Sequence, residues 1–384
     1  MSTQQKQHII ILGAGVIGLT TALVLQRSGK YQVLIVSEHK VSSPSLDSKV
    51  IKVDDFEFRD PTTVPALKMA SPYSGSHWRA ISTNTEEQLQ KCELQTYNTF
   101  MSLVKSNPAI PVKIVEGNDI YTFENTSSTW HFDHMHDFSV IKPSELPKGI
   151  KMGVKYKTLI INSPQYLVWL FNEFTKLGGL FKQAKVNSLR QLELFVNKFG
   201  PSNLPVSQLT IINCSALGSA HLTDVKDRKM HPIRGQVVVV YAPQVNRTVT
   251  KIGGKFMRYV IPRGDGTVIL GGTHLAHDYN STPNDQTTEE ILAETLELVP
   301  ELILDHSLVD PKQKLAQIKK KVLAVKVGFR PARLGGTRLE HDKIYGYSGN
   351  TIKVIHNYGH NGYGVQSSWG YANMVYSMLQ QSKL

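Results

Sequence analysis

The 384-residue chain has little cysteine and few long apolar runs. Its two cysteines, Cys92 and Cys214, are fewer than a secreted protein of this size often carries. We therefore expect buried free thiols in a reducing compartment, with a single disulfide as the alternative. Residues 9–25 carry no charge, but three glycines interrupt them, and their length is at the lower limit for a bilayer span. We expect a soluble protein with no membrane partner.

The sequence also lacks dense basic blocks and low-complexity tracts, although its formal net charge is +12. Lysine and arginine are scattered, without the interleaved basic and aromatic residues that mark a nucleic-acid surface. We therefore expect no nucleic-acid partner, and the basic balance suits a small anionic substrate or cofactor. The length of the chain suggests two domains or one elaborate α/β fold, and its 41% share of hydrophobic residues is enough for a normal buried core.

Metal-binding spacings are missing as well. The chain has neither the His-Glu-x-x-His pattern of zinc hydrolases nor paired cysteines. The histidines His131, His134 and His136 lie beside Asp133 and Asp137, and a surface metal site is one interpretation of this cluster. A polar loop explains the same residues, so we expect no metal.

What the chain does contain is a strand, a turn and a helix in the order of a dinucleotide-binding unit. Residues 8–12 predict a buried parallel strand, residues 18–29 a helix and residues 32–36 a second strand. The turn reads Gly13-Ala14-Gly15-Val16-Ile17-Gly18. Its glycines permit a tight turn, close approach of the backbone to a pyrophosphate at the helix N-terminus, and close packing of helix on strand.

An acidic residue is expected about twenty residues after this turn, where it holds ribose hydroxyls. Glu38 occupies that place, and Ser37 is the neighbouring candidate. The motif does not separate FAD from NAD, so an NAD-dependent dehydrogenase is an alternative on this ground alone.

The remaining pattern predicts an α/β protein, with a Rossmann-like nucleotide domain and an inserted, mostly antiparallel sheet that forms a substrate domain. Further strands are expected at residues 158–161, 209–214, 236–241, 259–261, 267–270 and 354–355, with a hairpin turn at 264–266. Helices are expected at residues 86–106, 163–178, 287–298 and 367–379, and a loop at 42–65. Ser163 and Thr287 are the expected residues at two helix starts. The predicted nucleotide domain comprises residues 1–60, 155–225 and 325–384, and the substrate domain residues 61–154 and 226–324.

Seven segments carry a resemblance to one known family. They are Ala70-Ser71-Pro72-Tyr73-Ser74-Gly75-Ser76-His77-Trp78, Asn213-Cys214-Ser215-Ala216, Arg234-Gly235-Gln236, Tyr259-Val260-Ile261-Pro262-Arg263, Gly271-Gly272-Thr273, Gly328-Phe329-Arg330-Pro331 and residues 356–364. In this order they resemble the D-amino-acid oxidase family, which includes the D-aspartate oxidases, and more narrowly its fungal peroxisomal members. The resemblance covers nearly the whole chain.

The chain departs from the family pattern at four positions. Tyr73 and His77 replace a Trp and an Asn in the segment along the flavin, and Ala216 stands where the family usually has Gly. Asn361 replaces a small residue beside the active site. These changes bear on substrate detail rather than on reaction type, and they weaken the transfer of a flavin contact to His77.

The resemblance implies FAD as the cofactor, in a discontinuous FAD-binding domain. The residues that it implies as cofactor contacts are Gly13, Ala14, Gly15, Val16, Ile17, Gly18, Ser37, Glu38, Ala70, Ser71, Gly75, Ser76, His77, Val186, Ser215, Arg330, Gly359, Asn361, Gly362, Tyr363, Gly364 and Gln366.

Three residues have implied catalytic roles. Arg330 holds the substrate α-carboxylate through two parallel hydrogen bonds, and the Tyr259 hydroxyl contacts the same carboxylate. The Gly362 carbonyl accepts a hydrogen bond from the substrate amine. The structural alternatives are a salt bridge for Arg330 and a core position for Tyr259.

The implied reaction is the oxidative deamination of a D-amino acid. A hydride passes from the substrate Cα to flavin N5, oxygen is reduced to hydrogen peroxide, and the imino acid hydrolyses to a 2-oxo acid and ammonia. A D-aspartate oxidase, another FAD-dependent amine or amino-acid oxidase, and a non-enzymatic binding protein of the same fold are the alternatives.

Four cationic side chains are candidates for contact with the substrate side chain: Arg79, Lys255, Arg258 and His274. If Tyr259 faces the site, Arg258 points to the opposite face of its strand. His274 would carry only a partial charge near neutral pH. We therefore expect a neutral D-amino acid in preference to an acidic one.

The last three residues, Ser382-Lys383-Leu384, match the tripeptide that the peroxisomal import receptor reads. We expect this receptor as a partner and the peroxisomal matrix as the location, because a peroxide-forming oxidase suits an organelle that contains catalase. The oligomeric state stays open, with a homodimer as one alternative.

Overall fold

The computed structural model describes residues 6–42, 50–60, 65, 67–196, 209–255, 257–305 and 307–381. No helix in these ranges is long and apolar enough to cross a membrane. The expected peroxisomal address, Ser382-Lys383-Leu384, lies outside the described residues, so the location and the import receptor stay predictions. The homodimer also stays a prediction.

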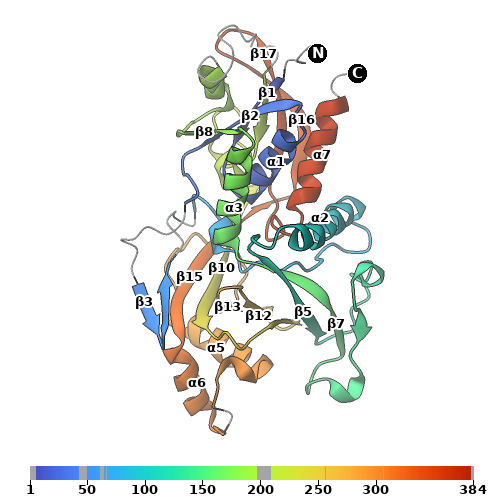
Figure 1. Cartoon of the computed structure of the whole chain (residues 1–384), viewed down its shortest axis with the longest axis vertical. Coiled ribbons are helices and arrows are strands. Elements are labelled where there is room, and N and C mark those ends of the chain that lie inside the picture. The colour runs from blue at the N-terminus through green and yellow to red at the C-terminus, as the bar shows by residue number, and fades with distance from the viewer. Residues whose placement is uncertain are drawn as a thin grey trace.

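A six-stranded sheet forms one end of the elongated molecule (Figure 1), in the order β16-β17-β9-β1-β2-β8. Its strands are β1 (Gln7–Leu12), β2 (Tyr31–Ser37), β8 (Leu180–Gln183), β9 (Thr210–Asn213), β16 (Arg338–Tyr345) and β17 (Thr351–Tyr358). Every neighbouring pair is parallel except β16 and β17. Helix α1 (Val16–Arg27) packs between α3 (Ser163–Lys176) and α7 (Ser368–Gln381). The predicted Rossmann-like strand, turn and helix are therefore confirmed.

A nine-stranded sheet forms the other end, in the order β14-β10-β13-β12-β11-β5-β7-β6, and β15 pairs with the other edge of β10. Its strands are β5 (Val112–Tyr121), β6 (Ser139–Val140), β7 (Met152–Ile161), β10 (Met230–Tyr241), β11 (Arg247–Ile252), β12 (Arg258–Pro262), β13 (Thr267–Gly271), β14 (Leu275–Ala276) and β15 (Val322–Arg333). Only β5 and β11 pair in parallel, so the predicted mostly antiparallel sheet is confirmed.

Three further helices cover this second sheet and join it to the first. Helices α5 (Asp285–Leu298) and α6 (Pro311–Lys320) close one end of the molecule (Figure 1), and apolar residues of both pack on Val238 and Leu270. Helix α2 (Glu87–Ser106) contacts β5, β7 and α7. Short 3₁₀ helices occur at Ser71–Tyr73, Phe132–His134, Pro143–Glu145, Leu189–Phe195, Ala216–Ala220 and Pro300–Leu302.

Several local predictions differ from the structure. The expected loop at 42–65 contains a hairpin, β3 (Val50–Val53) with β4 (Phe56–Arg59). Asn162 rather than Ser163 occupies the N-cap position of α3, without a side-chain hydrogen bond to the helix, and the Ser163 hydroxyl donates to Ser76 Oγ at 2.6 Å. Helix α5 starts earlier than expected, because the Asn284 side chain accepts from the backbone N–H of Thr287 at 2.8 Å.

The predicted domain boundaries do not coincide with the sheets everywhere. Positions 155 and 325 fall inside β7 and β15, and both strands belong to the nine-stranded sheet. Strand β15 was missed because Gly328 and Pro331, two residue types that weaken or interrupt strands, lie within it. The rest of the domain division stays a prediction.

Both cysteines are buried free thiols, as expected. Cys92 lies on α2 and Cys214 directly follows β9. Burial raises the pKa of the Cys92 thiol to about 12, with a further contribution from the neighbouring Glu93, and burial also raises the pKa of Cys214.

The turn after β9 contains a backbone conformation that suits glycine. Ala216, where the family usually has Gly, adopts φ = 51°. A residue with a Cβ loses roughly 1–2 kcal/mol in this left-handed region, because the Cβ crowds the following carbonyl.

We predict that Ala216→Gly raises the free energy of unfolding by about 0.5–1 kcal/mol, since relief of this crowding exceeds the entropy that glycine loses on folding. Urea unfolding of the FAD-bound protein measures the change. The matched control is Ala220→Gly in the same 3₁₀ helix, where φ is negative and the substitution should destabilise. Equal destabilisation by both substitutions would contradict the prediction.

Candidate active site

A cavity of about 1050 Å³ is lined by residues from both sheets. At one end lies the glycine-rich turn after β1, and at the other lie Tyr259 of β12 and Arg330 of β15. All predicted cofactor residues line it except Gly18 and Tyr363. The Tyr363 hydroxyl instead lies 3.0 Å from Thr337 Oγ1, so its predicted cofactor contact is not supported by its position.

The glycine-rich turn has the clearance that a pyrophosphate needs. A Cβ on Gly13, whose φ is 110°, would lie 2.6 Å from the Cys214 carbonyl oxygen, and a Cβ on Gly18 would collide with the Gly13 carbonyl. A Cβ on Gly15 would meet only Ser71 Oγ, at 3.3 Å, so Gly15 leaves the cavity side open. Gly18 therefore serves the packing of helix on strand, and Gly15 the approach of a ligand.

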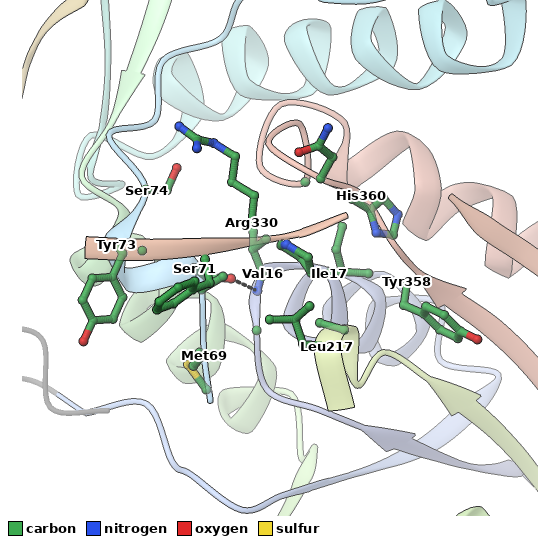
Figure 2. A pocket seen from close by; sticks show the side chains of 18 of the residues that line it. Val16, Ile17, Met69, Ser71, Tyr73, Ser74, Leu217, Arg330, Tyr358 and His360 are labelled. Carbon is green, nitrogen blue, oxygen red and sulfur yellow. Dashed lines mark hydrogen bonds between the residues drawn. The ribbon is translucent and has the colours of Figure 1, made fainter. Parts of the chain in front are cut away.

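The N-terminus of α1 opens onto the cavity beside a serine from a distant segment. The Val16 N–H donates to Ser71 Oγ at 3.1 Å, as the dashed line in Figure 2 shows. Further along, Ser37 and Glu38 both line the cavity, and so does Val186. The Glu38 carboxylate lies 3.6 Å from Lys68 Nζ. Turn, helix end and acidic residue thus fit a dinucleotide such as FAD, whose ribose and pyrophosphate they would hold.

Arg330 projects from β15 on the side opposite Val16 and Ile17 (Figure 2). Its guanidinium donates to the Thr273 carbonyl at 3.1 Å and forms no ion pair with any described residue. A Cβ on Gly235 would lie 2.5 Å from Arg330 Nη1, and one on Gly362 would lie 3.1 Å from Arg330 Cδ. The structural salt bridge considered for Arg330 is thus absent among these residues, and its charge is available to an anion in the cavity.

Tyr259 lines the cavity from β12, two strands away from β10. Its ring occupies the space over Gly271 and Gly272, where any Cβ would collide with it. Met257 also lines the cavity, as strand alternation requires.

Arg258, between Met257 and Tyr259, faces away from the cavity. It is buried, donates to Glu294 Oε1 of α5 at 2.8 Å and donates to the Gly272 carbonyl at 2.9 Å. The candidate role of Arg258 in binding a substrate side chain is therefore wrong, whereas its expected orientation is confirmed. Lys255 does not line the cavity either.

Two of the four cationic candidates do line the cavity, His274 and Arg79. Partial burial and the neighbouring Arg330 lower the pKa of His274, so its imidazole is neutral near pH 7. Arg79 keeps its charge: burial lowers its pKa, but attraction to the buried Asp119 and other groups raises it more. The Arg79 guanidinium donates to the Ala80 carbonyl at 3.2 Å and contacts Met257 Sδ at 3.7 Å.

The flavin-side segment and the C-terminal segment supply neutral groups to the same cavity. Burial lowers the pKa of His77 to about 3, with help from Arg79, and burial alone lowers that of His360 to about 3. Both imidazoles are therefore uncharged. Ser76 and Asn361 adopt φ values of 41° and 45°, so two residues that line the cavity hold strained backbone there.

Two contributors were missed by the sequence. Met257 directly precedes β12 and lies two residues before Tyr259, so it faces the same side. The alternation of side chains along an extended segment could have predicted this. Gly235 was noted only as part of a motif, and its role in making room for Arg330 depends on a pairing between β10 and β15 that the sequence does not reveal.

Comparison with known proteins agrees with this geometry. Residues 8–378 match the family model described as FAD dependent oxidoreductase. The chain is 29% identical over 377 residues to the D-amino-acid oxidase of Schizosaccharomyces pombe, covering 97% of this chain and 96% of that protein. It is 30% identical over 390 residues to the D-aspartate oxidase of Talaromyces thermophilus, covering 97% and 95%.

A solved structure of similar fold is glycine oxidase from Bacillus cereus. Its TM-score is 0.66 at 15% sequence identity, and the match covers 98% of this chain and 96% of that one. At this identity the likeness concerns the fold alone. With the family model spanning nearly the whole sequence and the cavity fitting a dinucleotide, the chain belongs to the FAD-dependent oxidoreductases, and its cofactor is FAD.

Proposed function

We propose that the protein oxidises D-amino acids, with neutral side chains preferred, to 2-oxo acids, ammonia and hydrogen peroxide. The observation that carries the proposal is the Arg330 guanidinium, which lies in the cavity without an ion-pair partner among the described residues. Curated relatives named D-amino-acid oxidase and D-aspartate oxidase support the same substrate class.

Arg330 and Tyr259 converge on one part of the cavity. Three strand spacings, about 14 Å, separate the backbones of β15 and β12. The two side chains shorten this gap, because Arg330 leans over Gly235 and Tyr259 leans over Gly271. A carboxylate placed between them accepts two parallel hydrogen bonds from the guanidinium and one from the phenol hydroxyl.

The positive charge of the cavity also prepares the amino group. Arg330 and Arg79 both disfavour a second cation, so a bound ammonium loses its proton more readily than in water. Gly362 lies beside the Arg330 side chain, and its carbonyl is the proposed acceptor of a hydrogen bond from the resulting amine. The Cα of a chiral amino acid carries one hydrogen, so with carboxylate and amine both held the configuration decides to which side that hydrogen points, and this accounts for a choice of enantiomer.

FAD, when bound, supplies the acceptor for the hydride and passes the electrons to oxygen. The chain contributes orientation and a fixed electrostatic field rather than an acid or base. The preference for neutral side chains follows from the neutral His274 and from the engagement of Arg258 by Glu294.

The absorbance spectrum of the purified protein tests the proposal directly. We expect a flavin spectrum that D-alanine bleaches without oxygen, faster than D-aspartate does and without response to L-alanine. A protein reconstituted with FAD that responds to none of the three would refute the proposed activity.

Arg330→Lys should lower kcat/KM for D-alanine by about tenfold to a hundredfold, because lysine keeps the charge but loses the paired hydrogen bonds, worth about 1.5–3 kcal/mol. Steady-state oxygen consumption gives the value. The control is Arg228→Lys at an exposed position outside the cavity lining, which should leave the rate unchanged. An unchanged kcat/KM for D-alanine in Arg330→Lys would contradict the role of Arg330 in binding the substrate carboxylate.

A D-aspartate oxidase is the second candidate, because Arg79 places a fixed cation in the cavity. If Arg79 holds a distal carboxylate, Arg79→Gln should lower kcat/KM for D-aspartate by about tenfold, the effect of one lost charged hydrogen bond, and change that for D-alanine far less. Comparison of the two substrates in one preparation separates the loss of a contact with the distal carboxylate from general damage to the enzyme. A wild-type preference for D-aspartate above about tenfold, or 1.4 kcal/mol, would make this second candidate the assignment.

A further inference from the structure

Glu93 is a carboxylate buried in α2 behind the cavity wall. Its side chain is completely shielded from solvent, yet it does not line the cavity itself. Oε1 accepts from the Ile81 N–H at 3.1 Å, and Oε2 accepts from the Ser82 N–H at 3.3 Å and the Ser82 hydroxyl at 2.5 Å. The segment that presents His77, Arg79 and Ile81 to the cavity is thus anchored to α2.

A fourth donor to Glu93 comes from the opposite side. Gln366, which lines the cavity just before α7, donates through Nε2 to Glu93 Oε1 at 2.7 Å. The same nitrogen also donates to the Arg79 carbonyl. Both protons of the Gln366 amide are therefore occupied by acceptors behind the cavity wall.

This arrangement fixes which end of the amide faces the cavity. The Gln366 Oε1 atom has no hydrogen-bond partner among the described residues, so it is the group left to meet a ligand. Rotation of the amide by 180° would set its oxygen against the Arg79 carbonyl and the Glu93 carboxylate. Burial raises the pKa of the Glu93 carboxyl, and the hydrogen bonds that it accepts from Ser82, Ile81 and Gln366 oppose that rise. As a carboxylate it has only acceptors, so it opposes that rotation, and the hydrogen-bond network rather than the atom positions decides the assignment.

We propose that Glu93 is a positioning residue that holds Gln366 with its amide oxygen toward the substrate. The inference rests on the proposed function, since an oxygen acceptor suits the amino group of a D-amino acid and would repel its carboxylate. Glu93 touches neither substrate nor cofactor, and it acts through Gln366 and through the wall at 79–81.

A glutamine at position 93 reproduces the shape of the side chain but cannot accept at both ends. Its amide NH₂ must face either the Ile81 N–H and the Gln366 NH₂ or the Ser82 backbone N–H. In the first case Gln366 rotates to find a partner and presents its NH₂ to the cavity. In the second case the Ser82 N–H loses its acceptor, which loosens the wall at 79–81 that also holds Gln366 through the Arg79 carbonyl. Glu93→Gln should therefore lower kcat/KM for D-alanine by about tenfold, the effect of one lost and one misplaced hydrogen bond.

A double-mutant cycle with Gln366→Ala distinguishes positioning from general damage. If Glu93 acts through Gln366, Glu93→Gln should change kcat/KM less than about twofold once Gln366 is removed. An equal loss in both backgrounds would overturn the proposal. Glu87→Gln is the matched control, because Glu87 lies on the same helix, exposed, and pairs with Lys91. It should leave kcat/KM unchanged.

Ser82→Ala separates stability from positioning. It removes one hydrogen bond to Glu93 without touching Gln366, so the urea midpoint should fall while kcat/KM stays within about twofold of wild type. If Glu93→Gln fails to fold, Glu93→Asp enters the cycle in its place and should show the same dependence on Gln366.

Urea unfolding of the same variants keeps the test separate from the proposed activity. If none of the D-amino acids bleaches the flavin of the wild-type protein, the proposed function fails. The contact between Glu93 and Gln366 is still measured by the midpoints, which should be non-additive for the pair. Additive midpoints together with additive kinetics would overturn the positioning role.

Discussion

The cavity depends on glycine wherever its walls come together. At the nucleotide end, the Gly13 and Gly18 positions admit no Cβ, because the backbone of β9 and of the turn itself already fills that space. At the substrate end, Gly235 and Gly271 give up their side-chain volume to Arg330 and Tyr259. The two large polar side chains can therefore lie flat over neighbouring strands and approach each other, although their backbones are three strand spacings apart.

A second constraint is the distribution of charge across β12. Arg258 on the far face is neutralised by Glu294, whereas the cations on the cavity face, Arg79 and Arg330, are held by uncharged acceptors. Among the described residues neither Arg79 nor Arg330 forms an ion pair, although buried Asp119 attracts Arg79, so the substrate end of the cavity attracts carboxylates and discourages ammonium ions. His77 and His360, whose pKa values burial lowers to about 3, stay neutral and add no charge to the cavity when the pH changes near neutrality.

The sequence predicted the parts of this structure that depend on local pattern. The apolar run before Gly13, the helix after it and the hairpin at Gly264–Gly266 follow from residues adjacent in the chain, and all are confirmed. Strand alternation also predicted that Arg258 would turn away from Tyr259. By contrast, Glu93 and Gln366 are 273 positions apart in the chain. Ser71, which accepts from the Val16 N–H at the start of α1, is 55 positions from Val16. Such contacts follow from how sheets and helices pack, so no local pattern could disclose them.

The burial of the two cysteines has a consequence for the durability of such an enzyme. Peroxide attacks the thiolate form of cysteine and proceeds through sulfenic acid to damage that is not repaired. Cys92 and Cys214 are enclosed by α2, α7 and the turn after β9, and their raised pKa values keep both sulfurs protonated. An oxidase of the proposed kind would therefore carry no easily oxidised thiol among its described residues, and its working lifetime should be limited by other side chains, foremost the methionines that line the cavity, Met69, Met230 and Met257.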